Sequence, residues 1–153
     1  MNLEKVSRDD WIVGGLALLL VIDLLFLPWF SASGASLTAT DGPDALFGAL
    51  GVIAVLAVIA DLAVERLSPQ TQLPAIAGSR AGTRFVLAAA AAAFLALKFL
   101  LQISHFSDLG FGFWLAVVLT GALVFILMQL RAGRPMMPRR PAERTGAPGP
   151  PTA

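Results

Sequence analysis

Residues 45–64 read ALFGALGVIAVLAVIADLAV, a run in which Asp61 is the only charged residue. A helix of about 20 residues, rising ~1.5 Å per residue, spans a hydrocarbon core of ~30 Å. A strand of an outer-membrane barrel would instead alternate polar and apolar side chains over about ten residues. Because backbone groups in lipid must be hydrogen-bonded within their own segment, this run predicts a transmembrane helix.

Three further runs have a similar length and a similarly apolar composition: residues 11–30, 85–104 and 111–130. The chain of 153 residues is 57% hydrophobic and 14% charged, whereas a soluble domain has about 25% charged residues. A soluble protein of this size cannot bury so much apolar surface. The expected fold is therefore an all-α membrane protein, with four transmembrane helices in an up-down bundle over residues 1–132.

The first run has a second interpretation, a cleaved signal peptide with residues 31–33 as its small-residue site. An N-terminal region containing Glu4, Asp9 and Asp10, a long apolar segment and a charge at Asp23 disfavour it. We expect the first run to stay in the protein as a span.

Basic residues are distributed unevenly between the predicted loops. Of the 11 lysines and arginines, all except Lys98 lie before the first span, between the second and third, or after the fourth. The segments 31–44 and 105–110 contain none. Since basic loops stay on the cytoplasmic side, both termini are expected to be cytoplasmic, in a multi-pass protein of the cell membrane.

Residues 133–153 are rich in proline, arginine, glycine and alanine. Such a composition cannot build a packed core, so it predicts a disordered cytoplasmic tail. A basic segment beside a bilayer is expected to contact anionic lipid headgroups. The tail lacks the interleaved aromatic residues of single-strand binders, and no nucleic-acid partner is expected.

Two charges of opposite sign lie within predicted spans. Asp23 is seven residues before the end of the first span and Lys98 six before the end of the third, so both lie roughly 10 Å below the same boundary. Buried charges at one depth are expected to meet, which predicts an ion pair. Gln102 and His105 follow Lys98 at helical spacing and extend a polar stripe. The pair could fix packing or bind a proton or substrate, or Lys98 could snorkel to the boundary.

Asp61 lies near the cytoplasmic end of the second span, close in sequence to Glu65 and Arg66. A carboxylate there predicts a boundary pair with an arginine, either Arg66 or Arg84. Small residues recur every third position along the second span, and residues 88–93 are all alanine. These small residues predict close packing of the second and third spans or, alternatively, self-association.

The chain has no cysteine and one histidine, His105. This excludes disulfides, cysteine-ligated metals and multi-histidine sites. His105 and Asp108 are expected to be solvated loop residues, not metal ligands. Without a nucleophile–base set or paired carboxylates, we expect no catalytic, cofactor-binding or metal-binding residues and no enzymatic activity.

Two short motifs, Phe26-Leu-Pro-Trp-Phe30 and Asp41-Gly-Pro-Asp44, close the first span and open the second. With them the chain resembles a loose group of small, uncharacterised four-helix membrane proteins of high-GC bacteria. The resemblance implies a bacterial inner membrane and no activity. The chain is also similar in layout to small multidrug-resistance transporters, but its acidic residue is Asp23 instead of a glutamate, and its oriented loops disfavour antiparallel assembly.

These observations favour a non-enzymatic accessory or assembly subunit of the bacterial cytoplasmic membrane. The alternative is a small transporter or channel subunit that uses Asp23 and Lys98. Besides the lipid bilayer, the expected partner is another membrane protein or a second copy of the chain.

Overall fold

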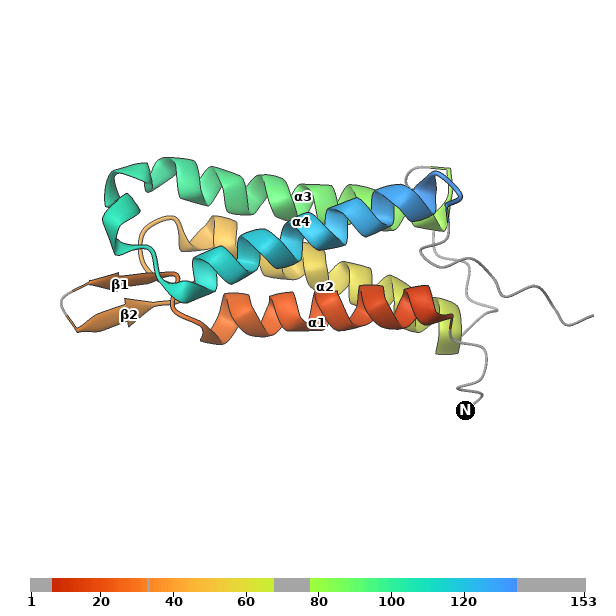
Figure 1. The fold of residues 1–153 in the computed structure, drawn as a ribbon, viewed down its shortest axis with the longest axis horizontal. Helices are drawn as coiled ribbons and strands as arrows, with labels where there is room; N and C mark the ends of the chain where they lie inside the picture. Colours follow the sequence, from red (N-terminus) through yellow and green to blue (C-terminus); the bar gives the residue numbers. More distant parts are fainter. Residues whose placement is uncertain (1–6, 33, 68–77, 135–153) are drawn as a thin grey trace, which may run out of the picture.

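A computed structural model describes residues 7–32, 34–67 and 78–134. Its long helices are antiparallel to their neighbours in sequence and form an up-down bundle (Figure 1). They are α1 (Arg8–Phe26), α2 (Ala45–Leu67), α3 (Arg80–Leu101) and α4 (Phe111–Arg131). Three short elements lie at one end: β1 (Phe30–Ala32), β2 (Ala35–Leu37) and the 3-10 helix η2 (Ile103–Asp108). We call this the hairpin end, and the opposite end, where α2 ends and α3 begins, the arginine end.

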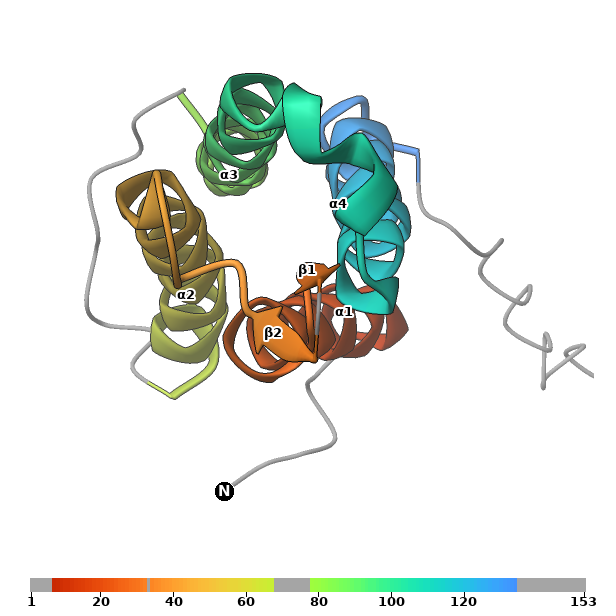
Figure 2. The same ribbon diagram turned by 90° about the vertical axis from the view of Figure 1, so that its left-hand side faces the viewer.

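Each helix packs mainly against two others. The extensive contacts are α1 with α2, α2 with α3, α3 with α4, and α4 with α1, so that α1 and α3 lie diagonally across the bundle (Figure 2). Buried apolar side chains from all four helices meet along the axis; among the most buried are Leu20, Leu24, Val55, Val58, Ala91, Leu123 and Leu127. The core is therefore continuous from one end of the bundle to the other.

Three helices, α2, α3 and α4, are long and apolar enough to cross a membrane. Large apolar side chains are also exposed on the outside of the bundle, for example Ile53 on α2 and Val118 on α4. A soluble surface rarely exposes so many, whereas lipid accommodates them. Helix α1 includes four charged residues, Arg8, Asp9, Asp10 and Asp23.

Local signals at α1 explain why the helix is shifted toward the N-terminus relative to the expected 11–30 run. Ser7 and Asp10 form a capping box, as their spacing predicts, so the helix begins at Arg8. It ends at Phe26 because Leu27 precedes Pro28 and is forced into the extended region.

Helix α3 is shifted in the same direction relative to the expected 85–104 run. The Ser79 hydroxyl accepts a hydrogen bond from the Gly82 backbone N–H and caps the helix. The α-helix ends at Leu101, and the chain continues as η2, where His105 departs from helical geometry. Helices α2 and α4 begin where the sequence predicts and extend slightly further.

The segment between α1 and α2, expected to be a loop, contains an antiparallel hairpin. Phe30 pairs with Leu37 and Ala32 with Ala35, and Trp29 N–H donates to the Leu37 carbonyl at 2.8 Å. Strands of three residues are too short to show an alternating pattern in the sequence. The predicted tail lies outside the described residues from position 135 onward.

Candidate functional site

Lys98 is fully buried at the hairpin end, where it joins α3 to the segment that leads into α2. Its Nζ donates to the backbone carbonyl oxygens of Ala39 at 2.6 Å and Asp41 at 3.0 Å. Carbonyl dipoles can replace the hydration of an ammonium group when they converge on it. Lys98 therefore holds residues 39–41 against the bundle.

Asp23 does not pair with Lys98, and the expected ion pair is absent from this part of the structure. Asp23 is also fully buried, but neither of its carboxylate oxygens has a hydrogen-bond partner. The indole of Trp29 is its neighbouring donor, yet the indole nitrogen makes no hydrogen bond either. The expected ion pair does not form because α1 and α3 lie diagonally across the bundle. Lys98 donates to loop carbonyls instead.

The expected polar stripe on α3 is only partly formed. Gln102 Nε2 donates to the Pro43 carbonyl, so Gln102 and Lys98 hold the same loop. His105 is exposed in η2, where its Nδ1 lies 3.2 Å from the Ser104 hydroxyl. It is separated from the other two because the α-helix ends before it.

Close backbone contacts complete the hairpin end. A Cβ atom at Gly48 would lie 1.8 Å from the Ala39 carbonyl oxygen, and one at Gly110 2.3 Å from that of Pro28. The backbone N–H of Gly110 donates to the Trp29 carbonyl at 2.8 Å. Glycine is required at both positions, since any side chain would separate the loop from the helices. We call residues 28–32, 34–43 and 102–110 the cap.

The three tryptophans do not form a simple headgroup belt. Trp11 and Trp114 are more than half exposed, as expected for rings at the ends of spans. Trp29 is 1% exposed and contacts the edge of Phe113, with ring centroids 5.5 Å apart. Trp29 therefore belongs to the packing of the cap, which its position in the sequence did not indicate.

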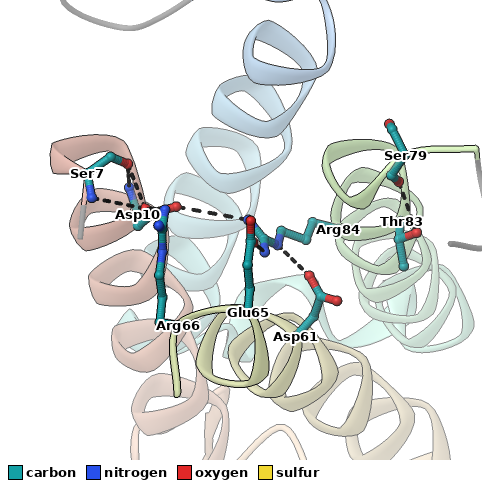
Figure 3. Close-up of polar contacts among 8 residues, drawn as sticks. All are labelled: Ser7, Asp10, Asp61, Glu65, Arg66, Ser79, Thr83 and Arg84. Carbon is teal, nitrogen blue, oxygen red and sulfur yellow. Dashed lines mark hydrogen bonds and ion pairs between the residues drawn. The ribbon is translucent and has the colours of Figure 1, made fainter. Parts of the chain in front are cut away.

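Charged side chains gather at the arginine end (Figure 3). Arg84 of α3 reaches across to α2, where its Nε donates to Asp61 Oδ2 at 2.6 Å and its Nη2 pairs with Glu65. Arg66 pairs with Asp10 of α1. The predicted boundary pair of Asp61 with an arginine is confirmed, and Arg84 is that arginine. The cluster ties three helices together.

The predicted close approach of the second and third spans is also present. Helices α2 and α3 share the most extensive contact in the bundle. A Cβ atom at Gly51 would lie 2.9 Å from a methyl group of Leu95. The absence of a side chain at Gly51 therefore lets Leu95 of α3 pack against the α2 backbone.

An apolar groove of about 710 Å³ lies between α3 and α4. Its walls include Ala92 and Ala96 of α3 and Val117, Gly121, Val124 and Met128 of α4. Val117 and Met128 are about half exposed, so the groove opens to the outside of the bundle. We call it the α3–α4 groove. The sequence analysis did not identify it, because the small residues on its two walls lie far apart in the chain.

Scans of protein-family models, of curated proteins and of solved structures gave no match to this chain. The function is therefore inferred from the buried residues Asp23 and Lys98, the cap and the α3–α4 groove.

Proposed function

We propose that this protein is a four-span subunit of the bacterial cytoplasmic membrane, with both termini in the cytoplasm. We further propose that it is not an enzyme and that it acts as an accessory or assembly subunit. Its cap would form a fixed surface on the outer side of the membrane. The observation that carries the proposal is Lys98, whose buried ammonium group holds the cap through the backbone carbonyls of Ala39 and Asp41.

The fourth span would be α1. Its exposed face includes Leu18, Leu19, Ile22 and Leu25, which continue the apolar outer surface of the other helices. The charges Arg8, Asp9 and Asp10 are confined to its first turn, where a helix can meet the interface. Only Asp23 lies deeper, and it faces the bundle interior, as a charged residue in a span is expected to do.

The orientation can be tested with single cysteines, because the chain has no native cysteine. Ser36→Cys in β2 and Ser107→Cys in η2 should react with a membrane-impermeant maleimide in intact cells. Arg8→Cys and Arg134→Cys should react only after permeabilisation. Labelling of Arg134→Cys from outside would overturn the proposed topology.

A transporter or channel role is the second candidate, and one observation favours it. Asp23 is a buried carboxyl group without a hydrogen-bond partner, and such groups in spans are used to bind protons. Against it, Lys98 is bound to backbone carbonyls and does not face Asp23. The two charges therefore do not form a common binding site.

Proton flux into proteoliposomes distinguishes the two candidates. The proposed accessory role predicts the same passive flux with and without the protein. It also predicts no change with Asp23→Asn, for which Gly15→Leu on α1 is a neutral control. A flux that depends on Asp23 would replace the proposal with the transporter role.

The assembly role itself is tested at the cap. A photoreactive amino acid at Ser36 should form one defined crosslink in cells. Lys98→Met should abolish this crosslink at unchanged protein level, because the cap is no longer held. A crosslink that survives Lys98→Met would show that Lys98 does not hold the contact surface, and the absence of any crosslink at Ser36 in the native protein would overturn the assembly role.

A further inference from the structure

We infer that the α3–α4 groove is a binding site for one anionic phospholipid. An acyl chain would lie in the groove and the phosphate would bind Arg131 at its foot. The inference rests on the proposed function only in assigning this lipid to the cytoplasmic leaflet. The site itself depends on side chains within α3 and α4.

The groove has the size and lining of a site for an apolar ligand. Its volume of about 710 Å³ lies within the range of roughly 300–1,000 Å³ that ligand pockets have. From Phe113 to Met128 it follows α4 for roughly 22 Å at ~1.5 Å per residue, longer than the ~15 Å of one leaflet. A lipid tail from one leaflet therefore fits along it.

Small side chains make the groove deep enough for a chain. Ala92 and Ala96 leave space on the α3 side. On the α4 side, a Cβ atom at Gly121 would meet no atom within 4 Å. Toward the hairpin end the walls become aromatic, with Phe99 and Phe113 at a centroid distance of 4.9 Å. The aromatic rings narrow this end, so a tail would enter from the arginine end.

Arg131 continues the groove-lining face of α4 by one turn. The lining residues Val117, Gly121, Val124 and Met128 recur at steps of three and four, and Arg131 is the next position in this series. Its guanidinium lies over the Phe85 ring, 5.3 Å from the centroid. Phe85 is seven residues before Ala92 and so lies on the same face of α3. This contact between the two helices forms the foot of the groove.

The charge at the foot specifies the class of lipid. Arg131 is exposed, and within the described residues its guanidinium makes no salt bridge to a carboxylate. Three acidic residues of this end, Asp10, Asp61 and Glu65, pair with Arg66 and Arg84. A fourth, Asp9, makes no salt bridge to Arg131 within the described residues. A guanidinium matches the geometry of a phosphate, and basic pockets between spans bind anionic headgroups. A phosphatidylglycerol-type lipid, which has a net negative charge, therefore fits better than a zwitterionic one.

The test uses the full chain in dodecyl maltoside and native mass spectrometry. The probes are phosphatidylglycerol and phosphatidylcholine with identical acyl chains. We expect one retained phosphatidylglycerol and roughly tenfold weaker binding of phosphatidylcholine, as for the loss of one charge-assisted contact. Arg131→Gln should remove this preference, whereas Arg8→Gln, an exposed arginine of the same end on α1, should keep it.

A second variant tests the groove independently of the charge. Gly121→Leu places a side chain in the open space of the groove and should weaken binding of both lipids. Gly15→Leu is the matched control, since its Cβ also meets no atom within 4 Å and lies on α1. Equal retention of both lipids by the native chain, or binding unchanged by Gly121→Leu, would overturn the inference.

Two other results would also overturn it. If truncation after Arg134 removes the preference and Arg131→Gln keeps it, the tail and not the groove selects the lipid. If Gly121→Leu dissociates a dimer without changing lipid binding, the groove is an interface between two copies. Because lipid binding is measured in detergent, its failure is distinct from a failure of the proposed topology, which cysteine labelling measures in cells.

Discussion

The two ends of the bundle each bury a cation, and they stabilise it with different groups. At the arginine end, Arg84 lies between the carboxylates of Asp61 and Glu65. At the hairpin end, Lys98 donates to the backbone carbonyls of Ala39 and Asp41. A planar guanidinium can bind two carboxylates at once, whereas a compact ammonium group suits convergent carbonyl oxygens. The difference shows that a buried cation does not need an acidic residue at the same depth.

The largest effect is expected at the arginine end. Arg84→Met would leave Asp61, which is 7% exposed, without its cation. Breaking a buried pair in this way costs about 3–5 kcal/mol. The value should be near the lower limit, because Glu65 is more exposed than Asp61. The measurement is the free energy of unfolding in detergent.

Arg66→Met is the matched control for this substitution. Arg66 and its partner Asp10 are at the same end, but a third of the Arg66 side chain is exposed. Its loss should therefore cost less than about 1 kcal/mol. Equal losses for the two arginines would mean that burial does not determine the strength of the cluster.

A smaller effect is expected at the hairpin end. Lys98→Met would leave the carbonyl groups of Ala39 and Asp41 without this donor. Ala39 is buried and Asp41 is exposed, so the cost is expected mainly at the Ala39 carbonyl, and an unsatisfied buried acceptor costs about 1–3 kcal/mol. Part of this cost is offset because a buried ammonium group no longer has to be desolvated. Hydrogen exchange should also become faster in residues 38–44 and stay unchanged at the arginine end. Unchanged exchange in the loop would show that Lys98 does not hold the cap.

The next prediction is that substitutions at Asp23 and Lys98 are not coupled in their effect on the free energy of unfolding. Asp23 and Lys98 are matched in depth but are not in contact, so their effects on stability should add within about 0.5 kcal/mol. Asp23→Leu alone should cost little or stabilise the protein, since it removes an unpartnered buried carboxyl group. A double-mutant cycle with Asp23→Leu and Lys98→Met measures this. Rescue of Lys98→Met by Asp23→Leu would restore the ion-pair hypothesis.

The two ends also differ in how far the sequence could predict them. Asp61 and Arg84 are side-chain charges near helix ends, so residue types alone predicted a boundary pair. The partners of Lys98 are backbone carbonyls, which every residue has, and no residue type marks them. Hydropathy predicted the bounds of α2 and α4 to within a few residues. It did not predict the end of α1, which lies earlier because Leu27 precedes Pro28.

The hairpin and the α3–α4 groove were missed for a related reason. Strands β1 and β2 have three residues each, fewer than a periodic signal needs. The groove depends on Ala92, Ala96 and Gly121 facing one another, which requires knowing that α3 and α4 are neighbours. The motif Asp41-Gly-Pro-Asp44 indicated where the second span begins, but not that the backbone of this segment accepts a hydrogen bond from Lys98.

The smallest effect concerns pH and Asp41, whose carbonyl is one of the two that bind Lys98. The hydroxyl of Thr38 donates to the Asp41 carboxylate at 2.7 Å and its backbone N–H donates at 3.1 Å. The Thr38 hydroxyl, and then its backbone N–H, lower the pKa of Asp41 below its ordinary value of 3.8. A carboxylate with a lowered pKa in the folded state stabilises fully above the pKa of the unfolded chain. This contribution is lost as the pH falls through the folded pKa.

Thr38→Val removes the hydroxyl donor and keeps the backbone N–H. The variant should therefore have a lower thermal midpoint in detergent than the native protein at pH values above about 4, by a constant amount. As the pH falls through the folded pKa of Asp41 the difference should become smaller, because protonated Asp41 gains less from the hydroxyl. A constant part should remain, because the Thr38 hydroxyl also accepts a hydrogen bond from the Thr40 backbone N–H at 3.3 Å. Arg66→Met at the arginine end is the control. It should lower the thermal midpoint, but the difference in midpoint between proteins with and without Thr38→Val should stay the same in its presence. A difference of the same size at pH 3 and pH 7 would mean that Thr38 acts through packing, and that the charge of Asp41 does not help to place the carbonyl that binds Lys98.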